Sequence, residues 1–172
     1  MSQPSILLLA RADGRRVDTP FSQQALSAAD PFAASRQVAW SGPDGVSAGI
    51  IEGRHAVASD DYPHSETIVV HSGQVTLKTA DQTLQLTVGG SAVIGRGSVV
   101  HIEAQEGSQW AFCSVTTALP TPGLTLLDPL AQLSPSAAPE PQILIGPTPQ
   151  CRSRNAFEDN ASDLRVGLFT ST

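Results

Sequence analysis

The chain has few of the residues that build cross-linked or highly charged proteins. Of its 172 residues only 15% are charged and 5% are aromatic, and only two are cysteines. Two isolated thiols, Cys113 and Cys151, favour a reducing compartment over a disulfide scaffold, so we expect a cytoplasmic protein. The net charge of −6 and the lack of a Lys/Arg cluster argue against nucleic-acid binding, which requires clustered positive charge.

Long hydrophobic runs are also missing. The most apolar segment near the start, residues 6–10, is short and has no basic stretch before it. A membrane-spanning helix needs about 20 apolar residues, and a signal peptide needs a basic stretch followed by an apolar core. We therefore expect no signal peptide, no membrane anchor and no membrane partner.

Glycine and proline are plentiful, with 14 and 13 residues, which favours short strands joined by tight turns. Apolar residues that alternate with period two predict such strands through the middle of the chain. The predicted strands cover residues 36–40, 46–52, 66–71, 74–78, 84–88, 92–94, 99–104 and 110–116. Short strands at this spacing predict an antiparallel sandwich or barrel.

A proline-rich segment follows, over residues 118–150. Leucines and isoleucines such as Leu130, Ile143 and Ile145 lie between its prolines. They offer enough apolar surface to dock on a barrel. We expect an extended connector packed on the barrel surface, rather than a disordered linker.

The opening of the barrel is repeated near the end of the chain. The offset is 117 residues from Trp40 to Phe157 and 118 residues from Gly49 to Gly167. Repetition of a whole unit is the signature of duplication. We expect residues 151–172 to form the opening of a truncated second unit; the alternative is a chance likeness between two hairpins.

The last predicted strand, residues 163–170, has an apolar edge with no predicted neighbour. Such edges pair with other strands. We expect this strand to join a sheet of its own barrel or of a neighbour's, and so to favour a homodimer.

Two blocks of residues carry a family pattern. The first contains Tyr62, Glu66 and Gly73, and the second runs from Gly89 to Gly97. Their spacing resembles the cupin motifs H-x-H, three or four residues, E, six residues, G, and G, five residues, P-x-G, two residues, H. Within the cupin superfamily, the chain most resembles the group that includes ethanolamine-utilisation protein Q and the bicupin ureidoglycine aminohydrolase.

The resemblance implies an all-β fold, a cupin-type antiparallel jelly-roll barrel over residues 36–117. Residues 1–35 would form an extended N-terminal arm along its outside. The Pro-rich C-terminal extension would comprise the connector, 118–150, and the start of a second cupin unit, 151–172. The chain would then hold one complete unit of a bicupin and part of another.

The histidines that hold a metal in the family pattern are replaced. Their positions fall on Ser59, Asp61 and Val100. A site of three histidines and one carboxylate cannot form from these residues. We therefore expect no cofactor, with a divalent transition metal as the alternative.

Glu66 and His64 are the candidate catalytic residues, because residues two apart in a strand share a face. A carboxylate in a barrel mouth can bind a metal or act as a base. If a metal is bound, its ligands would be His64, Glu66 and His101. His101 is one residue out of place in the motif, so a bulge would have to turn it inward.

Tyr62, Asp61 and Arg96 are the candidate residues for binding a small-molecule ligand, since they lie on loops near the expected barrel mouth. Three functions stay open. The chain is a degenerate, metal-free barrel with a structural or ligand-holding role, a sensor that uses the barrel cavity without chemistry, or a metal-dependent enzyme that acts on a small polar metabolite of the ureide or sugar-acid type.

Overall fold

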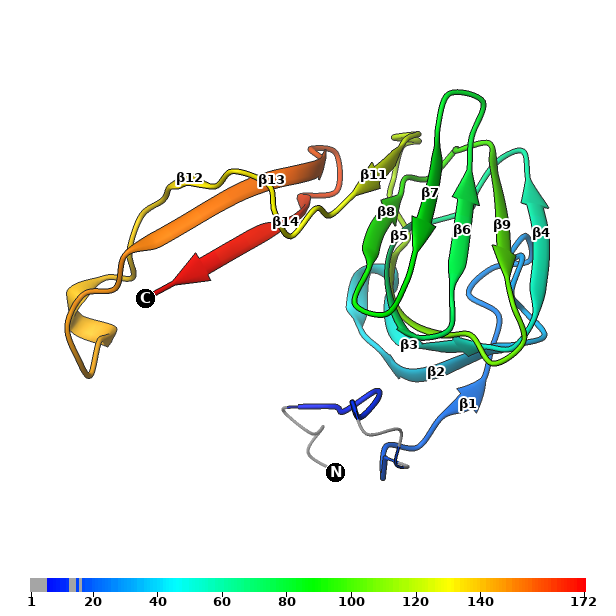
Figure 1. Cartoon of the computed structure of the whole chain (residues 1–172), viewed down its shortest axis with the longest axis horizontal. Helices are drawn as coiled ribbons and strands as arrows, with labels where there is room; N and C mark the ends of the chain where they lie inside the picture. Colours follow the sequence, from blue (N-terminus) through cyan, green and yellow to red (C-terminus); the bar gives the residue numbers. More distant parts are fainter. Residues whose placement is uncertain (1–5, 13–14, 16) are drawn as a thin grey trace.

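The computed structural model describes residues 6–12, 15 and 17–172, and antiparallel strands dominate it (Figure 1). The strands are β1 (Ser22–Gln23), β2 (Arg36–Ser41), β3 (Val46–Glu52), β4 (His55–Ser59), β5 (Ser65–Ser72), β6 (Val75–Lys78), β7 (Thr83–Leu86), β8 (Ser91–Ile94), β9 (Val100–Ala104), β10 (Gln109–Val115), β11 (Leu124–Leu126), β12 (Ser134–Pro135), β13 (Cys151–Asp159) and β14 (Leu164–Ser171). The described helical segments are the 3-10 turns η1 (Pro43–Gly45) and η2 (Pro141–Ile143). Neither is long or apolar enough to cross a membrane.

Two sheets enclose the barrel. The larger has the strand order β1-β2-β3-β10-β5-β8-β11, and the smaller has the order β4-β9-β6-β7. Sequence neighbours are often not sheet neighbours, because the chain crosses repeatedly between the two sheets, as a jelly roll requires. The all-β, antiparallel jelly-roll barrel expected from the sequence is confirmed.

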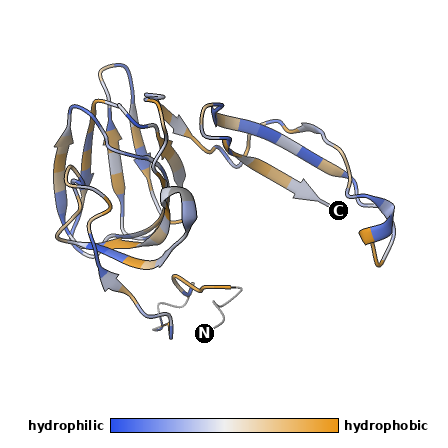
Figure 2. Cartoon of the chain, turned by 180° about the vertical axis from the view of Figure 1, so that it is seen from behind, coloured by the Kyte–Doolittle hydropathy of each residue, from blue (hydrophilic) through white to orange (hydrophobic). Residues whose placement is uncertain are grey.

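The core lies between the inner faces of these sheets. Ile68 and Phe112 contribute from the larger sheet, and Leu77 and Ile102 from the smaller one. Along β9 the burial alternates residue by residue, so the predicted period of two is observed directly. Figure 2 shows the resulting apolar and polar bands along the barrel strands.

The N-terminal arm is not wholly external as expected. Phe32 belongs to the core cluster, and Leu26 packs against that cluster. Asp30 is also buried. The segment before β2 therefore enters the end of the barrel. The rest of the expected arm includes residues 1–5, 13–14 and 16, which lie outside the described residues.

The proline-rich connector packs on the barrel only at its start. There β11 joins the larger sheet beside β8, and Leu124 and Leu127 are buried. The connector then leaves the barrel and follows β13 and β14 outward (Figure 1). The expected docking of Leu130, Ile143 and Ile145 on the barrel is wrong, because all three are strongly exposed.

Strands β13 and β14 form a hairpin that projects from the barrel (Figure 1). With β12 they make a separate three-stranded sheet in the order β12-β13-β14. The base of the hairpin is held by Phe157, which packs with Val93 and Leu127 of the barrel side. Leu164 and Val166 pack against this small cluster.

The hairpin β13–β14 has the same backbone construction as β2–β3. In β2 a bulge separates Val38, which faces Gly49, from Trp40. In β13 a bulge at the matching place separates Asn155, which faces Gly167, from Phe157. The two hairpins therefore share the position of the bulge and the glycine that lies opposite it.

Glycine is required opposite each bulge because the backbones of the two paired strands approach closely there. A Cβ on Gly49 would overlap the carbonyl oxygen of Gln37, and a Cβ on Gly167 would overlap that of Arg154. A side chain at either position would push the two strands apart, which explains why both hairpins have glycine there.

Candidate functional site

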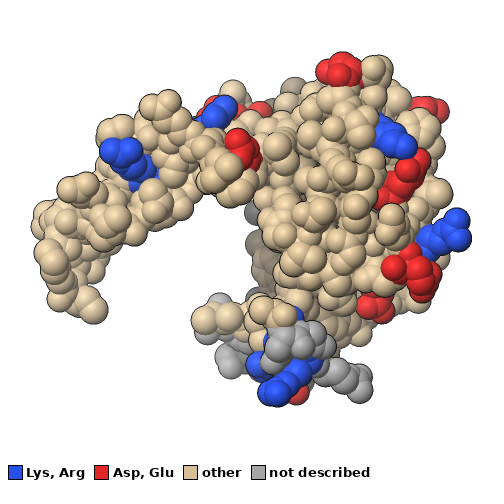
Figure 3. Space-filling model, in the orientation of Figure 1, with Lys and Arg blue, Asp and Glu red and all other residues tan. Residues whose placement is uncertain are grey.

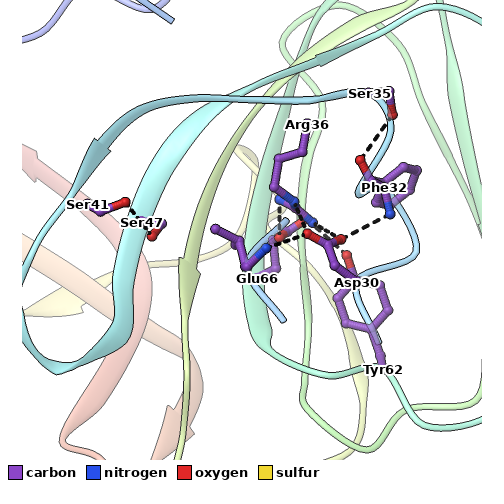
Figure 4. Close-up of polar contacts among 9 residues, drawn as sticks. Asp30, Phe32, Ser35, Arg36, Ser41, Ser47, Tyr62 and Glu66 are labelled. Carbon is purple, nitrogen blue, oxygen red and sulfur yellow. Dashed lines mark hydrogen bonds and ion pairs between the residues drawn. The ribbon is translucent and has the colours of Figure 1, made fainter. Parts of the chain in front are cut away.

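A buried arginine occupies the interior end of the barrel (Figure 4). Arg36, the first residue of β2, donates from Nε to Asp30 Oδ2 at 2.8 Å and from Nη2 to Asp30 Oδ1 at 3.1 Å. Two parallel bonds of this kind fix both the position and the plane of the guanidinium. Neither side chain has any exposed surface.

The same guanidinium also binds Glu66, the carboxylate of the cupin motif. Arg36 donates from Nη1 to Glu66 Oε2 at 2.8 Å, and the hydroxyl of Tyr62 donates to Glu66 Oε1 at 3.0 Å (Figure 4). Both oxygens of Glu66 therefore have partners inside the protein. The Glu66 side chain is also fully buried.

Arg36 reaches Glu66 across two intervening strands. β2 and β5 are separated in the sheet by β3 and β10, so the side chain must extend beneath them. Phe112 of β10 lies along this path, and the Arg36 Cζ stands 4.3 Å from the centroid of its ring. A guanidinium over an aromatic face is attracted by the ring quadrupole, so Phe112 stabilises the positive charge of Arg36.

Asp30 and Arg36 stay ionised although they are buried. Burial alone would raise the pKa of Asp30, but the hydrogen bond and charge of Arg36, with the backbone N–H groups of Leu26 and Phe32, hold it below its usual value. Burial lowers the pKa of Arg36, but Glu66, Tyr62 and Asp30 together outweigh that effect, so the pKa is raised above its usual value. Burial and Glu66 together raise the pKa of Tyr62 well above its usual value, which keeps its hydroxyl a donor.

His64 lies beside this network, in the loop that leads into β5. The residue is 1% exposed, and its ring stands edge-on to Tyr62, with 6.0 Å between the ring centroids. Its Nε2 has no hydrogen-bond partner among the described residues. Burial lowers the pKa of His64 more than the attraction of Glu66 raises it, so the imidazole is neutral at pH 7.

These residues do not fit a resident metal ion. Glu66 is saturated by Arg36 and Tyr62, and a cation bound there would lie against the positive guanidinium. Within the described residues no three His, Cys, Asp or Glu side chains are grouped as a metal site. The barrel interior therefore holds a fixed cation of its own in Arg36.

The other candidate residues are spread around the barrel. His101 is exposed on β9 between the buried Val100 and Ile102, so it points away from the interior and does not join His64 and Glu66. Asp61 is exposed. Arg96 is half-buried, and its Nη1 donates to the backbone carbonyl of Thr117, which ties it to a neighbouring loop.

Sequence reasoning brought out Tyr62, His64 and Glu66, which the structure brings together, but missed Arg36 and Asp30. A signal for Arg36 was present. It alternates with Val38 on the inward face of its strand, and an arginine there requires a buried carboxylate. Asp30 had no such signal, because it comes from a loop that the sequence placed outside the barrel.

Comparisons with known proteins agree with the barrel. No family model matches the chain, and no curated protein matches it. Among solved structures, the chain is similar to a protein of unknown function from Pseudomonas syringae pv. tomato that belongs to the DUF861 family. The two are 48% identical with a TM-score of 0.89, and the match covers 95% of this chain and 70% of that one.

A second similar structure is a cupin-2 domain protein from Shewanella frigidimarina. It is 24% identical, with a TM-score of 0.40, and the match covers 47% of this chain and 79% of that one. At this level of similarity we draw nothing further from the second comparison.

Proposed function

This chain belongs to the DUF861 family of the cupin superfamily, and within that family we propose that its barrel is a metal-free structural unit. The single observation that carries the proposal is the Arg36 guanidinium, which is bound to Glu66 at 2.8 Å. A cupin enzyme uses this carboxylate at its reactive centre, but here the carboxylate stabilises the fold.

The chemistry of the network supports a structural role. Each carboxylate oxygen of Asp30 and Glu66 accepts at least one hydrogen bond from the protein, so neither group is available as a base. The phenol of Tyr62 is committed to Glu66 in the same way. Buried groups with all their partners in place rigidify a core.

The alternative, a metal-dependent enzyme, is favoured by one observation: Nε2 of His64 has no hydrogen-bond partner in the part of the chain that the structure describes. A neutral imidazole nitrogen is a good metal ligand. A single imidazole beside a saturated carboxylate provides too few ligands, and we therefore place this function second.

We also propose that the hairpin β13–β14 is the opening of a second cupin unit. The shared bulge and the shared glycine opposite it support this interpretation. The barrel would then serve as the base that holds this second unit through Phe157.

Elemental analysis of the protein purified without an affinity tag tests the metal-free barrel. We expect substoichiometric manganese, iron, nickel and zinc, and no heat of binding when Mn²⁺ or Zn²⁺ is titrated in. Stoichiometric metal that disappears in Glu66→Ala and persists in the surface control Glu103→Ala would overturn the proposal in favour of the enzyme.

A thermal-shift screen with small acids, ureides and sugars tests the ligand-holding role. A ligand that binds only the native state raises the melting temperature. Because Tyr62 is buried and bound to Glu66, and Arg96 is bound to the backbone carbonyl of Thr117, we expect no shift that depends on either residue. A ligand whose stabilising effect is lost in Arg96→Ala would favour the sensor instead.

A further inference from the structure

The loop before β2 closes on itself at its base. The two residues of β1 pair with Gln37 and Val38 of β2. The backbone N–H of Gln24 then donates to the carbonyl oxygen of Arg36 at 3.2 Å. Residues 24–35 therefore leave the sheet and return to the same place as a compact Ω-loop, a kind of loop that is frequently functional. β1 lies at the edge of the larger sheet, and among the described strands it pairs only with β2.

Two side chains anchor this loop in the barrel. Of residues 24–35 only Asp30 and Phe32 are buried, and they are 7% and 2% exposed. The Asp30 carboxylate is bound by the buried guanidinium. The Phe32 ring stands edge-on to His55 and to Trp110, at 5.2 Å and 5.7 Å between ring centroids. The loop thus inserts one carboxylate and one phenyl ring into the end of the barrel.

The loop makes its own turn without help from the barrel. The backbone N–H of Leu26 donates to Asp30 Oδ2 at 2.9 Å, and that of Phe32 donates to Asp30 Oδ1 at 3.0 Å (Figure 4). Both bonds lie within the loop, so they would persist if the loop moved outward as a unit. Arg36 would lose Asp30 but keep Glu66 at Nη1. The buried guanidinium would therefore still be neutralised in an open state.

We infer that this loop is an internal plug, and that Asp30 and Phe32 occupy a binding site for a small aromatic carboxylic acid. The edge of Arg36 that binds Asp30 is the polar end of the site, because its two parallel donors match a carboxylate. His55 and Trp110 form the aromatic end, where the ring of the acid would replace Phe32. An aromatic lining with a few fixed polar groups is typical of small-molecule sites.

One polar atom beside the network has no partner in the closed state. His64 is 1% exposed, and its Nε2 makes no hydrogen bond within the described part of the chain. Its ring stands edge-on to Tyr62, which is bound to Glu66. Buried polar atoms without a partner are rare, so each one needs an explanation. An unused hydrogen-bonding position is expected if the loop reproduces a ligand only in part.

The surface of the barrel does not offer the acid an alternative of the same kind. Figure 3 shows acidic side chains spread over the visible face of the barrel, with single basic groups between them. The net charge of the chain is −6. A carboxylate therefore finds its fixed cation beneath the loop and not on that face.

The plug hides the site in the wild-type protein. Asp30 is tethered, so its effective concentration at Arg36 exceeds that of a free acid, and the apparent affinity falls with the fraction of open protein. The inference goes beyond the structural role of the barrel, since it concerns the edge of the guanidinium that Glu66 does not use. Metal bound at Glu66 would contradict the structural role and leave this edge untouched. All the contacts that define the plug lie within residues 22–112.

A loop-deleted variant tests the plug directly. Replacing residues 25–35 by Asn-Gly joins Gln24 to Arg36 through a two-residue turn that continues the pairing of β1 with β2. In calorimetric titration, phenylacetate should bind this variant at least about tenfold more tightly than the wild type, because no plug competes. Phenylacetamide has the same shape without the charge. It should bind at least about tenfold more weakly than phenylacetate, because charge-assisted bidentate bonds are the strong ones.

Asp30→Ala keeps the loop and removes only its carboxylate. Phe32 still fills the aromatic end, so acetate is the probe for this variant. Acetate should raise its melting temperature by at least about 2 °C more than sodium chloride at equal ionic strength, because a ligand of the folded state stabilises it. Asp81→Ala, which removes an exposed carboxylate, is the matched control and should respond equally to both salts.

Three results would overturn the inference. The first is a folded variant without its response, either a loop-deleted protein that binds phenylacetate no more tightly than the wild type or Asp30→Ala that responds equally to acetate and chloride. The second is equal binding of phenylacetate and phenylacetamide. The third is loss of folding in both variants, as judged by circular dichroism, which would make residues 24–35 an integral part of the core. If only one variant folds, its titration decides.

Discussion

Hairpins β2–β3 and β13–β14 share one backbone construction but have different surroundings. Both contain a bulge at the matching residue, and both have a glycine opposite the bulge. Strand β3 is flanked by β10 and lies over the core, whereas among the described residues β14 pairs only with β13, and Phe169 is exposed. The backbone requirements of a hairpin thus persist where its side-chain contacts differ.

The side chains at matching positions follow these surroundings. Arg36 and Val38 point into the barrel core, and their counterparts at an offset of 117 residues are Ser153 and Asn155. Neither Ser153 nor Asn155 is buried. The arginines of β13, Arg152 and Arg154, are exposed, whereas Arg36 is buried in the hairpin that provides it with Asp30 and Glu66. This difference between the two hairpins can be tested by substitution.

The largest effect is expected from Arg36→Met. It leaves the carboxylates of Asp30 and Glu66 buried without their cation, which typically costs about 3–5 kcal/mol. Chemical denaturation should show this loss of unfolding free energy. Arg154→Met is the control in the other hairpin, where the side chain is exposed and a change within about 0.5 kcal/mol is expected. Equal losses in both variants would contradict the contrast between the hairpins.

Phe157→Ala should detach the second hairpin and leave the barrel folded. Truncation of a buried phenylalanine costs about 3–5 kcal/mol, and here the loss falls on the small cluster with Val93 and Leu127. Limited proteolysis should cut the connector faster, while the melting temperature of the barrel is retained. Ile143→Ala, on the exposed part of the connector, is the control. Unfolding of the whole chain would mean that barrel and hairpin form one cooperative unit.

Gly49→Ala and Gly167→Ala compare the same backbone clash in the two settings. Each added Cβ meets a carbonyl oxygen, and forcing a side chain into a packed site costs about 1–3 kcal/mol. We expect Gly49→Ala to lower the melting temperature of the barrel. Gly167→Ala should leave it unchanged and increase hydrogen exchange in β14 only. If Gly167→Ala lowered the melting temperature of the barrel as much as Gly49→Ala does, the predicted difference between the two hairpins would be wrong.

The smallest expected effect is that of His64 on the pH dependence of stability. This effect is absent at neutral pH. Its pKa in the folded protein is lowered by burial, whereas in the unfolded chain it is near 6.5. Above that pH neither state is protonated, and His64 does not change stability. As the pH falls below it the unfolded chain takes up the proton, so the folded state loses stability.

His64→Gln should therefore flatten the loss of unfolding free energy between about pH 7 and about pH 5, by at most about 2 kcal/mol. Denaturation curves at each pH measure this slope. His101→Gln removes an exposed histidine and should retain the wild-type slope. A wild-type slope in His64→Gln would show that another group controls the acid sensitivity.

Much of the fold was predictable because it depends on local patterns. Alternation predicted the strands at 46–52 and 110–116 within a residue of β3 and β10. It missed β4, His55–Ser59, where every residue is half-buried or exposed and no apolar alternation stands out. The sequence shows that the connector is rich in leucine and isoleucine. Its composition does not say which surface, if any, these side chains contact.

The site was predictable only in part. The cupin motif identified Glu66, and the period of two placed His64 beside it. The partner that decides the chemistry, Arg36, lies 30 residues away along the chain. Which charge meets which across a barrel depends on strand order, and that order is not contained in any local pattern.

The ion network decides what a metal site in this barrel would require. Placing imidazoles at positions 59, 61 and 100 would not by itself create one, because the Arg36 guanidinium already neutralises the carboxylate of Glu66. Replacing Arg36 alone would leave two buried carboxylates without their cation. The arginine and the three motif positions would therefore have to change together.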